Sequence, residues 1–456
     1  MRELKDLLNQ IGDFHFQNGK DRIDFIGTLV KENNRVIIRT RIEKGNLNHV
    51  KRQIPFQIWG EISGTNVTLL DNYIIATSYN INSNCVEISA EPSEIVIGRS
   101  YVSDIFVTNI SASIEAMSHM FSDRVFNENV SFTKENPTVL SFAYPEDIEA
   151  MDTDGILRLY RGFSHDWSRH GIEYRYLPYI YYAFSKPTRI RDAIAKIACA
   201  RNLLSFFADY YLPLENLLFS DEQTDDAKNF SGYCDCQLYL NHKEDIEVPE
   251  EPFLIMTNKF SENFSEVWTN WLKFYADSIY IPTLFYEIIC NRSTRINRFL
   301  NLTQAIELYS VHYRDELAKG IAQADGYGKK QLPLKYRIED VLAQINGTLE
   351  ISEERRRLLA RAISNDRNFF THYNEQRYTE PSFEEISAAN RVLRYVLLSI
   401  VYKVIGIRDD YIKECKNRLN YSTFERDVSV ILKERQDINY TGSVKSFSQI
   451  GLQFLG

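Results

Sequence analysis

Two patterns of apolar residues divide the chain. Up to about residue 185, short runs of β-branched and aromatic residues alternate with turn residues at intervals of about ten positions. Ile23–Val30 and Arg35–Thr40 flank Lys31–Asn34, which predicts a hairpin, and Ser63–Asn66 has the composition of a second turn. Regularly spaced strands of this kind predict a sheet of the sandwich or barrel type.

Beyond about residue 259, apolar residues recur every three or four positions, which predicts helices. Ser352 is the expected cap of a helix that ends near Ser364, and Ser382 with Glu385 forms a capping box before a strongly apolar helix. Gly406 is the expected stop of that helix. The other predicted helices are 188–208, 292–317, 336–345, which Asn346-Gly347 is expected to end, 408–418 and 422–434.

These patterns predict an α+β protein, in which a mostly-β N-terminal domain precedes an all-α helical bundle. The expected bounds are 1–185 for the β-rich domain and 186–258 for a helix and small sheet that continue it. The helical domain is expected at 259–435 and a C-terminal tail at 436–456. A length of 456 residues agrees with two to four domains.

Charge and composition narrow the classes of function. The net charge of −9 argues against broad nucleic-acid binding, but arginines gather locally and fit a small phosphate site. These arginines are 292, 295, 298, 355, 356, 357, 361, 367 and 377. A pair of solvated helix faces explains them equally well.

Membrane, disulfide and metal sites lack support in the sequence. No run of about 18 apolar residues is present and the first residues are charged, so we expect a cytoplasmic protein with no membrane segment. The six cysteines are scattered without a Cys-x2-Cys pair, which favours reduced thiols over a zinc site. We therefore expect no metal and no cofactor.

The stretch with the best candidates for catalytic residues runs from Asp366 to Tyr373. It contains an Arg-x4-His motif, with Asn368 directly after Arg367. Five residues at about 100° each place Arg367 and His372 about 140° apart on an ideal helix. The motif therefore either needs the reach of the arginine or straddles a helix start, where Asp366 is a plausible N-cap.

Such a pair suits cleavage of RNA without a metal. A guanidinium offers two parallel donors to a phosphate, and an imidazole can take or give a proton near neutral pH. Asn368 can orient the phosphate, Tyr373 can stack on a base, and Glu307 and His312 on another helix can support the pair. The spacing alone also fits a solvated arginine beside an ordinary histidine.

Four helical segments and their order resemble the Apea-like branch of the HEPN superfamily. They are 298–307, 334–342, 366–373 and the apolar helix that follows. The N-terminal part is similar to the domain that accompanies this module, through Ile58-Trp59-Gly60, then Val67 to Asp71, and 201–207.

This resemblance implies an anti-phage HEPN endoribonuclease of the ApeA type, acting by abortive infection. It implies a homodimer in which two Arg-x4-His motifs form one metal-independent site, with Arg367 and His372 as the catalytic pair. The β-rich domain would sense a phage-derived trigger or restrain cleavage. A non-catalytic HEPN protein that binds nucleotide or RNA, or a ligand sensor with a helical dimerisation module, remains the alternative.

Overall fold

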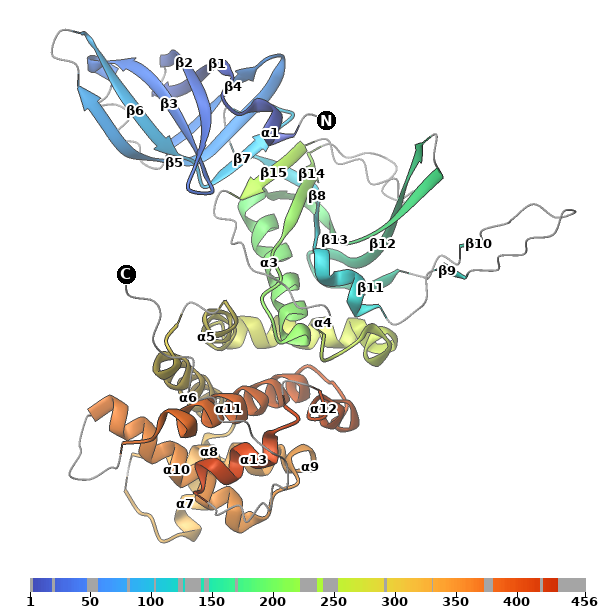
Figure 1. Ribbon diagram of the computed structural model, residues 1–456, viewed down its shortest axis with the longest axis vertical. Helices are drawn as coiled ribbons and strands as arrows, with labels where there is room; N and C mark the ends of the chain where they lie inside the picture. The colour runs from blue at the N-terminus through green and yellow to red at the C-terminus, as the bar shows by residue number, and fades with distance from the viewer. Residues whose placement is uncertain are drawn as a thin grey trace, which may run out of the picture. The chain divides into compact units, whose positions relative to one another are not determined.

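The computed structural model divides the chain into two compact units (Figure 1). The sheet unit comprises residues 1–293 and 397–418, and the helical unit comprises 294–396 and 419–456. The structure describes residues 3–18, 21–46, 56–79, 83–101, 104–121, 126–127, 141–142, 147–168, 171–221, 236–240, 253–290, 293–329, 331–372, 380–418 and 421–433. This division differs from the domain bounds expected above, which stay a prediction.

Six antiparallel strands at the N-terminus close into a barrel. Their order is β1-β2-β3-β6-β5-β4, and β4 returns to pair with β1. A short helix, α1 (Leu4–Leu7), precedes them. The strands are β1 (Ile11–Asn18), β2 (Asp21–Glu32), β3 (Arg35–Glu43), β4 (Phe56–Ile62), β5 (Thr65–Tyr79) and β6 (Cys85–Glu91).

Strand β5 allows the barrel to close because it bends. Its first half pairs with β4 and its second half pairs with β6. Between the halves, Asp71 has φ 47° and the register with β6 shifts after Ile74. Bulges of this kind increase the local bend of a strand.

Alternate residues of these strands point inward and form one core. They include Phe14, Phe16, Phe25, Leu29, Ile38, Val67, Leu69, Val86 and Ile88, all 9% exposed or less. The expected hairpins are present, since Asn33 and Asn34 have φ 48° and 63° between β2 and β3. Ser63 and Gly64 have φ 51° and 82° between β4 and β5, which suits the twist of two-residue hairpins.

The sheet continues from β5 into a second antiparallel part, in the order β7-β15-β14-β8-β13-β12-β11. Its strands are β7 (Glu94–Ile97), β8 (Phe106–Ser113), β11 (Ile148–Met151), β12 (Gly155–Ser168), β13 (Gly171–Arg189), β14 (Glu215–Ser220) and β15 (Cys236–Leu240). Strands β9 (Phe126–Asn127) and β10 (Ser141–Phe142) form a separate pair. The barrel and this extended sheet confirm the α+β class.

Helices cover the second part of the sheet. Helix α3 (Ile190–Ala208) packs on β8 and β13, and α4 (Phe264–Asp277) packs on β11 (Figure 1). Trp268 and Trp271 of α4 are fully buried. The remaining helices of the sheet unit are η1 (Glu115–Met120), η2 (Thr257–Lys259), η3 (Ser261–Asn263), α5 (Tyr280–Ile289) and α12 (Asp409–Cys415). Helix α11 (Phe383–Val404) runs through both units.

The helical unit is built around α10 (Glu353–His372), which packs against α8, α6 and α13. The other helices are α6 (Arg295–Tyr313), α7 (Asp315–Ala324), α8 (Leu334–Gln344), α9 (Asn346–Leu349) and α13 (Phe424–Ile431). Two buried carboxylates hold helices together through paired hydrogen bonds. Arg314 binds Asp340 at 2.6 and 2.9 Å, and Arg391 binds Asp427 at 2.7 Å twice.

One expectation about helix ends is wrong. The helix that begins after Ser352 does not end near Ser364 but continues to His372, so Asp366 lies inside it and is no N-cap. The expected helix end before Asn346 is confirmed, because α8 ends at Gln344 with Ile345 as its C-cap, and residues 346–349 then form the separate short helix α9. The capping box of Ser382 is confirmed. No helix in the described part is long and apolar enough to cross a membrane.

Candidate active site

Arg367 and Asn368 lie together in the last turns of α10. The Arg367 side chain is 31% exposed, and its Nη2 lies 3.6 Å from Oε2 of Glu307 on α6. Its Nη1 donates to Oδ1 of Asn368 at 3.5 Å. Both contacts are long for hydrogen bonds, so the guanidinium is positioned but not saturated. A phosphate oxygen can therefore compete for its donors.

His372 is the last residue of α10 and is exposed. Among the residues that the structure describes, no hydrogen bond or ion pair to its ring is present. A helix that continues through the motif keeps the angle of about 140° between His372 and Arg367. One chain thus presents the imidazole and the guanidinium on different sides of the helix.

Asp366 faces another part of the helical unit. Burial and, to a smaller extent, the nearby carboxylate of Glu385 raise the pKa of its carboxyl to about 7, against the opposing charge of Lys433. Glu385 accepts from the backbone N–H of Ser382 at 2.7 Å and lies 3.2 Å from Lys433. The charged neighbours of the Asp366 carboxyl are therefore Glu385 and Lys433, and not the Arg367 guanidinium. These surroundings favour a role for Asp366 in the packing of α10.

The other residues of the motif have modest structural roles or lie outside the description. The Thr371 hydroxyl donates to the backbone oxygen of Arg367 at 2.8 Å. Tyr373, proposed to stack on a base, lies outside the described residues. Phe369 and Phe370 are buried, and the Phe370 ring packs edge-on against Phe299 of α6 at 6.1 Å. These two rings anchor the end of α10 while its polar residues remain accessible.

Several arginines of the predicted basic patch are neutralised. Arg355 lies 3.4 Å from Glu425, and Arg357 lies 3.1 Å from Glu339 and 2.7 Å from Glu353. Exposed ion pairs of this kind add little to the stability of the fold, but each carboxylate offsets the positive charge of its arginine. The patch around α10 is therefore less cationic than its sequence implies.

The sequence suggested Glu307 as a residue that supports the motif, and the structure shows that it contacts Arg367. Glu307 was one of two candidates on the long helix, and the structure brings it to Arg367, whereas His312 is an exposed residue next to Tyr313. Which carboxylate meets the guanidinium depends on how α6 packs on α10. Within the described residues, no three His, Cys, Asp or Glu side chains are grouped to hold a metal ion.

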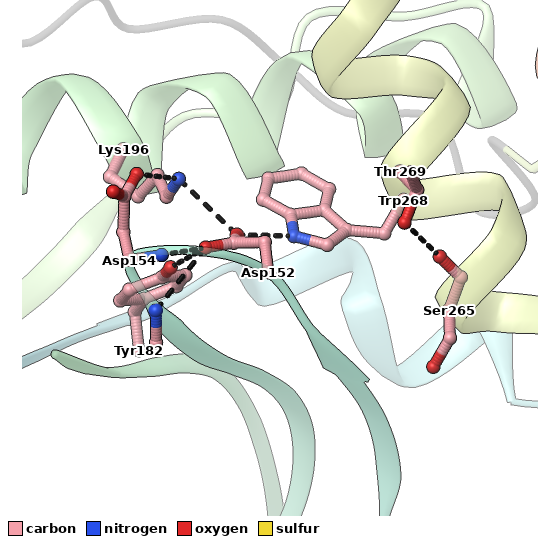
Figure 2. Close-up of polar contacts among 8 residues, drawn as sticks. Asp152, Asp154, Tyr182, Lys196, Ser265, Trp268 and Thr269 are labelled. Atoms are coloured by element: carbon pink, nitrogen blue, oxygen red, sulfur yellow. Dashed lines mark hydrogen bonds and ion pairs between the residues drawn. The ribbon is translucent and has the colours of Figure 1, made fainter. Parts of the chain in front are cut away.

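A second polar cluster surrounds Asp152 in the sheet unit (Figure 2). Its carboxylate accepts from the Tyr182 hydroxyl at 2.5 Å and the Trp268 indole N–H at 2.8 Å, and it lies 3.2 Å from Lys196. Lys196 also binds Asp154 at 2.7 Å. Burial opposes ionisation, but these donors and the backbone N–H of Asp154 hold the pKa of Asp152 below its usual value. The cluster joins α3, α4, β13 and the turn between β11 and β12, which indicates a structural role.

The barrel carries an open groove on its wall. It has a volume of about 810 Å³ and crosses β1, β2, β3, β6 and β5. Its lining combines the exposed side chains of Ile11 and Ile26 with Arg39 and Arg41. The two arginines are paired with Glu32 and Glu87. A groove of this size could hold a small ligand.

Two family models match the sequence. ApeA N-terminal domain 1 matches residues 10–271, and Apea-like HEPN matches residues 300–411. The first covers the barrel and the extended sheet, and the second runs from within α6 to the start of α12 and includes Arg367 and His372. No curated protein and no solved structure gives a match.

Proposed function

Because this chain belongs to the ApeA-type HEPN family, we propose that it is an endoribonuclease of anti-phage defence that cleaves RNA with Arg367 and His372. HEPN domains are generally nucleases, which supports the class of reaction. The single observation that carries the proposal is the accessibility of both side chains at the end of α10, where Arg367 has only weak internal contacts.

The reaction uses the 2′-hydroxyl of the RNA as nucleophile. His372 removes the proton of this hydroxyl, or donates a proton to the leaving 5′-oxygen, as the new bond from the 2′-oxygen to phosphorus forms and the bond to the 5′-oxygen breaks. The products are a 2′,3′-cyclic phosphate and a 5′-hydroxyl. Arg367 binds the scissile phosphate and stabilises the charge that builds on it, an effect of about 3 kcal/mol for such donors.

The site is proposed to be shared by two copies of the chain. The angle of about 140° separates the imidazole and the guanidinium of one α10, so one copy does not direct both at a single phosphodiester. Two motifs facing each other bring the His372 of one copy to the Arg367 of the other, and the two imidazoles can divide the acid and base roles. Asn368, which contacts Arg367, orients the phosphate.

The sheet unit is proposed to restrain or trigger this activity. An RNase that is always active would damage the cell that makes it, so a control is needed. The groove on the barrel is the proposed place where a phage-derived trigger binds.

The test is cleavage of total RNA by the purified chain, with and without EDTA, followed by mapping of the ends. We expect 2′,3′-cyclic phosphate ends that persist in EDTA, and no cleavage by Arg367→Ala or His372→Ala. The exposed residues Arg418 and His119 provide matched controls, since Arg418→Ala and His119→Ala leave cleavage unchanged. Cleavage that EDTA abolishes, or that His372→Ala retains, contradicts the proposal.

A further inference from the structure

A second group of arginines lies where α6 and α11 begin. Asn390 of α11 donates its amide to the backbone oxygen of Arg295 at 3.0 Å, which places the start of α6 against α11. The guanidinium carbon of Arg295 lies 3.3 Å from the centre of the Phe383 ring, at the first turn of α11. Two helix starts that are 88 residues apart in sequence, from 295 to 383, thus form one surface.

Three guanidinium groups share this surface. Arg295 and Arg298 are three residues apart on α6 and therefore lie on one face of it. Arg394 is one turn beyond Asn390 on α11, on the face that meets α6. Partial burial lowers the pKa of Arg298, and the positive charges of Arg394 and Arg295 lower it further. The fold therefore holds three guanidinium groups close together, an arrangement of donors that suits the oxygens of phosphate groups.

An exposed aromatic ring completes the surface. Phe383 is 73% exposed, more than any other large apolar residue that the structure describes. Arg295 covers one face of its ring, and the high exposure leaves the remaining ring surface open. A ring of this kind can stack on a nucleobase, while neighbouring guanidinium groups bind phosphates. Cations beside an accessible aromatic ring suit a nucleic acid strand better than a protein helix.

The surface lies near the end of the helix that carries His372. Phe299, the neighbour of Arg298, packs its ring against Phe370, which is two residues before His372. Glu307, farther along α6, contacts Arg367 instead. The two helices are thus antiparallel, and the start of α6 lies at the same end as His372.

We propose that Arg295, Arg298, Arg394 and Phe383 form a binding site for single-stranded RNA next to the cleavage site. Phe383 stacks on an unpaired base, and the three guanidinium groups bind the phosphates on either side of it. This inference rests on the proposed ribonuclease function and adds where the substrate is held. Because stacking requires an unpaired base, the site favours single-stranded over double-stranded RNA.

The experiment measures RNA binding by the full chain carrying His372→Ala, so that the probe is not cut. The probe is a fluorescent 12-nucleotide RNA without secondary structure, titrated over a range of salt concentrations. Phe383→Ala is expected to weaken binding about tenfold and Phe383→Trp to retain it. Arg295→Gln/Arg298→Gln is expected to weaken binding about 30-fold and to reduce the slope of log affinity against log salt by about 1.4, from two lost phosphate contacts.

Matched variants separate this site from general charge effects and from misfolding. Arg408→Gln/Arg418→Gln removes the same charge from exposed positions in the sheet unit and should change neither the affinity nor the slope by much. Arg295→Lys/Arg298→Lys keeps the charge and should restore the slope. Circular dichroism checks that each variant retains its helices.

The outcomes for the site and for the reaction are distinguishable. Unchanged affinity and slope in both the Phe383→Ala and the double arginine variants overturn the inference, while cleavage by the parent chain leaves the proposed function intact. If RNA binding depends on these residues but the parent chain does not cut RNA, the result supports the binding site and contradicts the proposed ribonuclease function. Equal affinity for single-stranded and double-stranded probes, or no measurable RNA binding, also overturns the inference.

Discussion

Replacing Asp366 with Asn is expected to stabilise the helical unit more at pH 8 than at pH 5. In the folded chain, burial and then Glu385 raise the pKa of this carboxyl to about 7 from an ordinary value of 3.8. The folded state therefore binds the proton more tightly than the unfolded state does. Stability is highest below the unfolded pKa and is lost as the pH rises towards the folded pKa, above which the loss is complete.

The size of the effect follows from the two pKa values. A difference of about 3 pH units corresponds to an upper limit of about 4 kcal/mol, at 1.36 kcal/mol per unit. The carboxyl is only partly buried, so we expect a gain of about 2 kcal/mol for Asp366→Asn at pH 8. The amide keeps the shape of the side chain and cannot ionise, and so removes most of the pH dependence between pH 5 and 8.

Urea unfolding followed by circular dichroism at 222 nm measures this effect, because the signal comes mainly from helices. The four tryptophans all lie in residues 1–293, so their fluorescence reports the sheet unit in the same samples. Glu354→Gln, at the exposed start of α10, is the control and should show no change in its effect between pH 5 and 8. An Asp366→Asn variant whose advantage over the parent chain is equal at both pH values refutes the reasoning.

Three further predictions concern stability and use urea unfolding. Arg391→Met leaves the buried carboxylate of Asp427 without its guanidinium and should cost the helical unit about 3 kcal/mol. Trp268→Phe removes a donor from Asp152 and should cost the sheet unit about 2 kcal/mol at neutral pH, a loss that fades as acid protonates the carboxylate through its lowered pKa. Gly60→Ala places a methyl group 2.2 Å from a backbone oxygen of β1 and should cost about 3 kcal/mol. An unchanged urea midpoint in any of these variants contradicts the corresponding contact.

Features that depend on a few neighbouring residues were predictable. The Asn33-Asn34 and Ser63-Gly64 turns, the capping box at Ser382 and the end of α11 at Gly406 are present as expected. Each follows from the backbone preference of one or two residues or from a side chain that bonds to a nearby N–H. The strand pattern likewise predicted a barrel or sandwich, although the bend of β5 that closes the barrel was not foreseen.

The path of α10 was mispredicted, because the reason for it lies outside the helix. Ser364, Asn365 and Asp366 are residues that favour helix ends, so a break before Arg367 was expected. The buried rings of Phe369 and Phe370 pack the next turn against the helical unit and keep the chain helical through the polar run. Tertiary packing thus outweighs a local preference of a few tenths of a kcal/mol per residue.

The order of residues was enough to place an arginine and a histidine five positions apart, with an asparagine beside the arginine, in a helical part of an α+β chain. It did not show that Glu307 meets Arg367, that Asp366 lies half-buried near Glu385, or that the starts of α6 and α11 bring arginines to Phe383. Spacing along one helix is set by its own geometry. Contacts between helices distant in sequence depend instead on which apolar faces pack together, and that packing is a property of the whole fold.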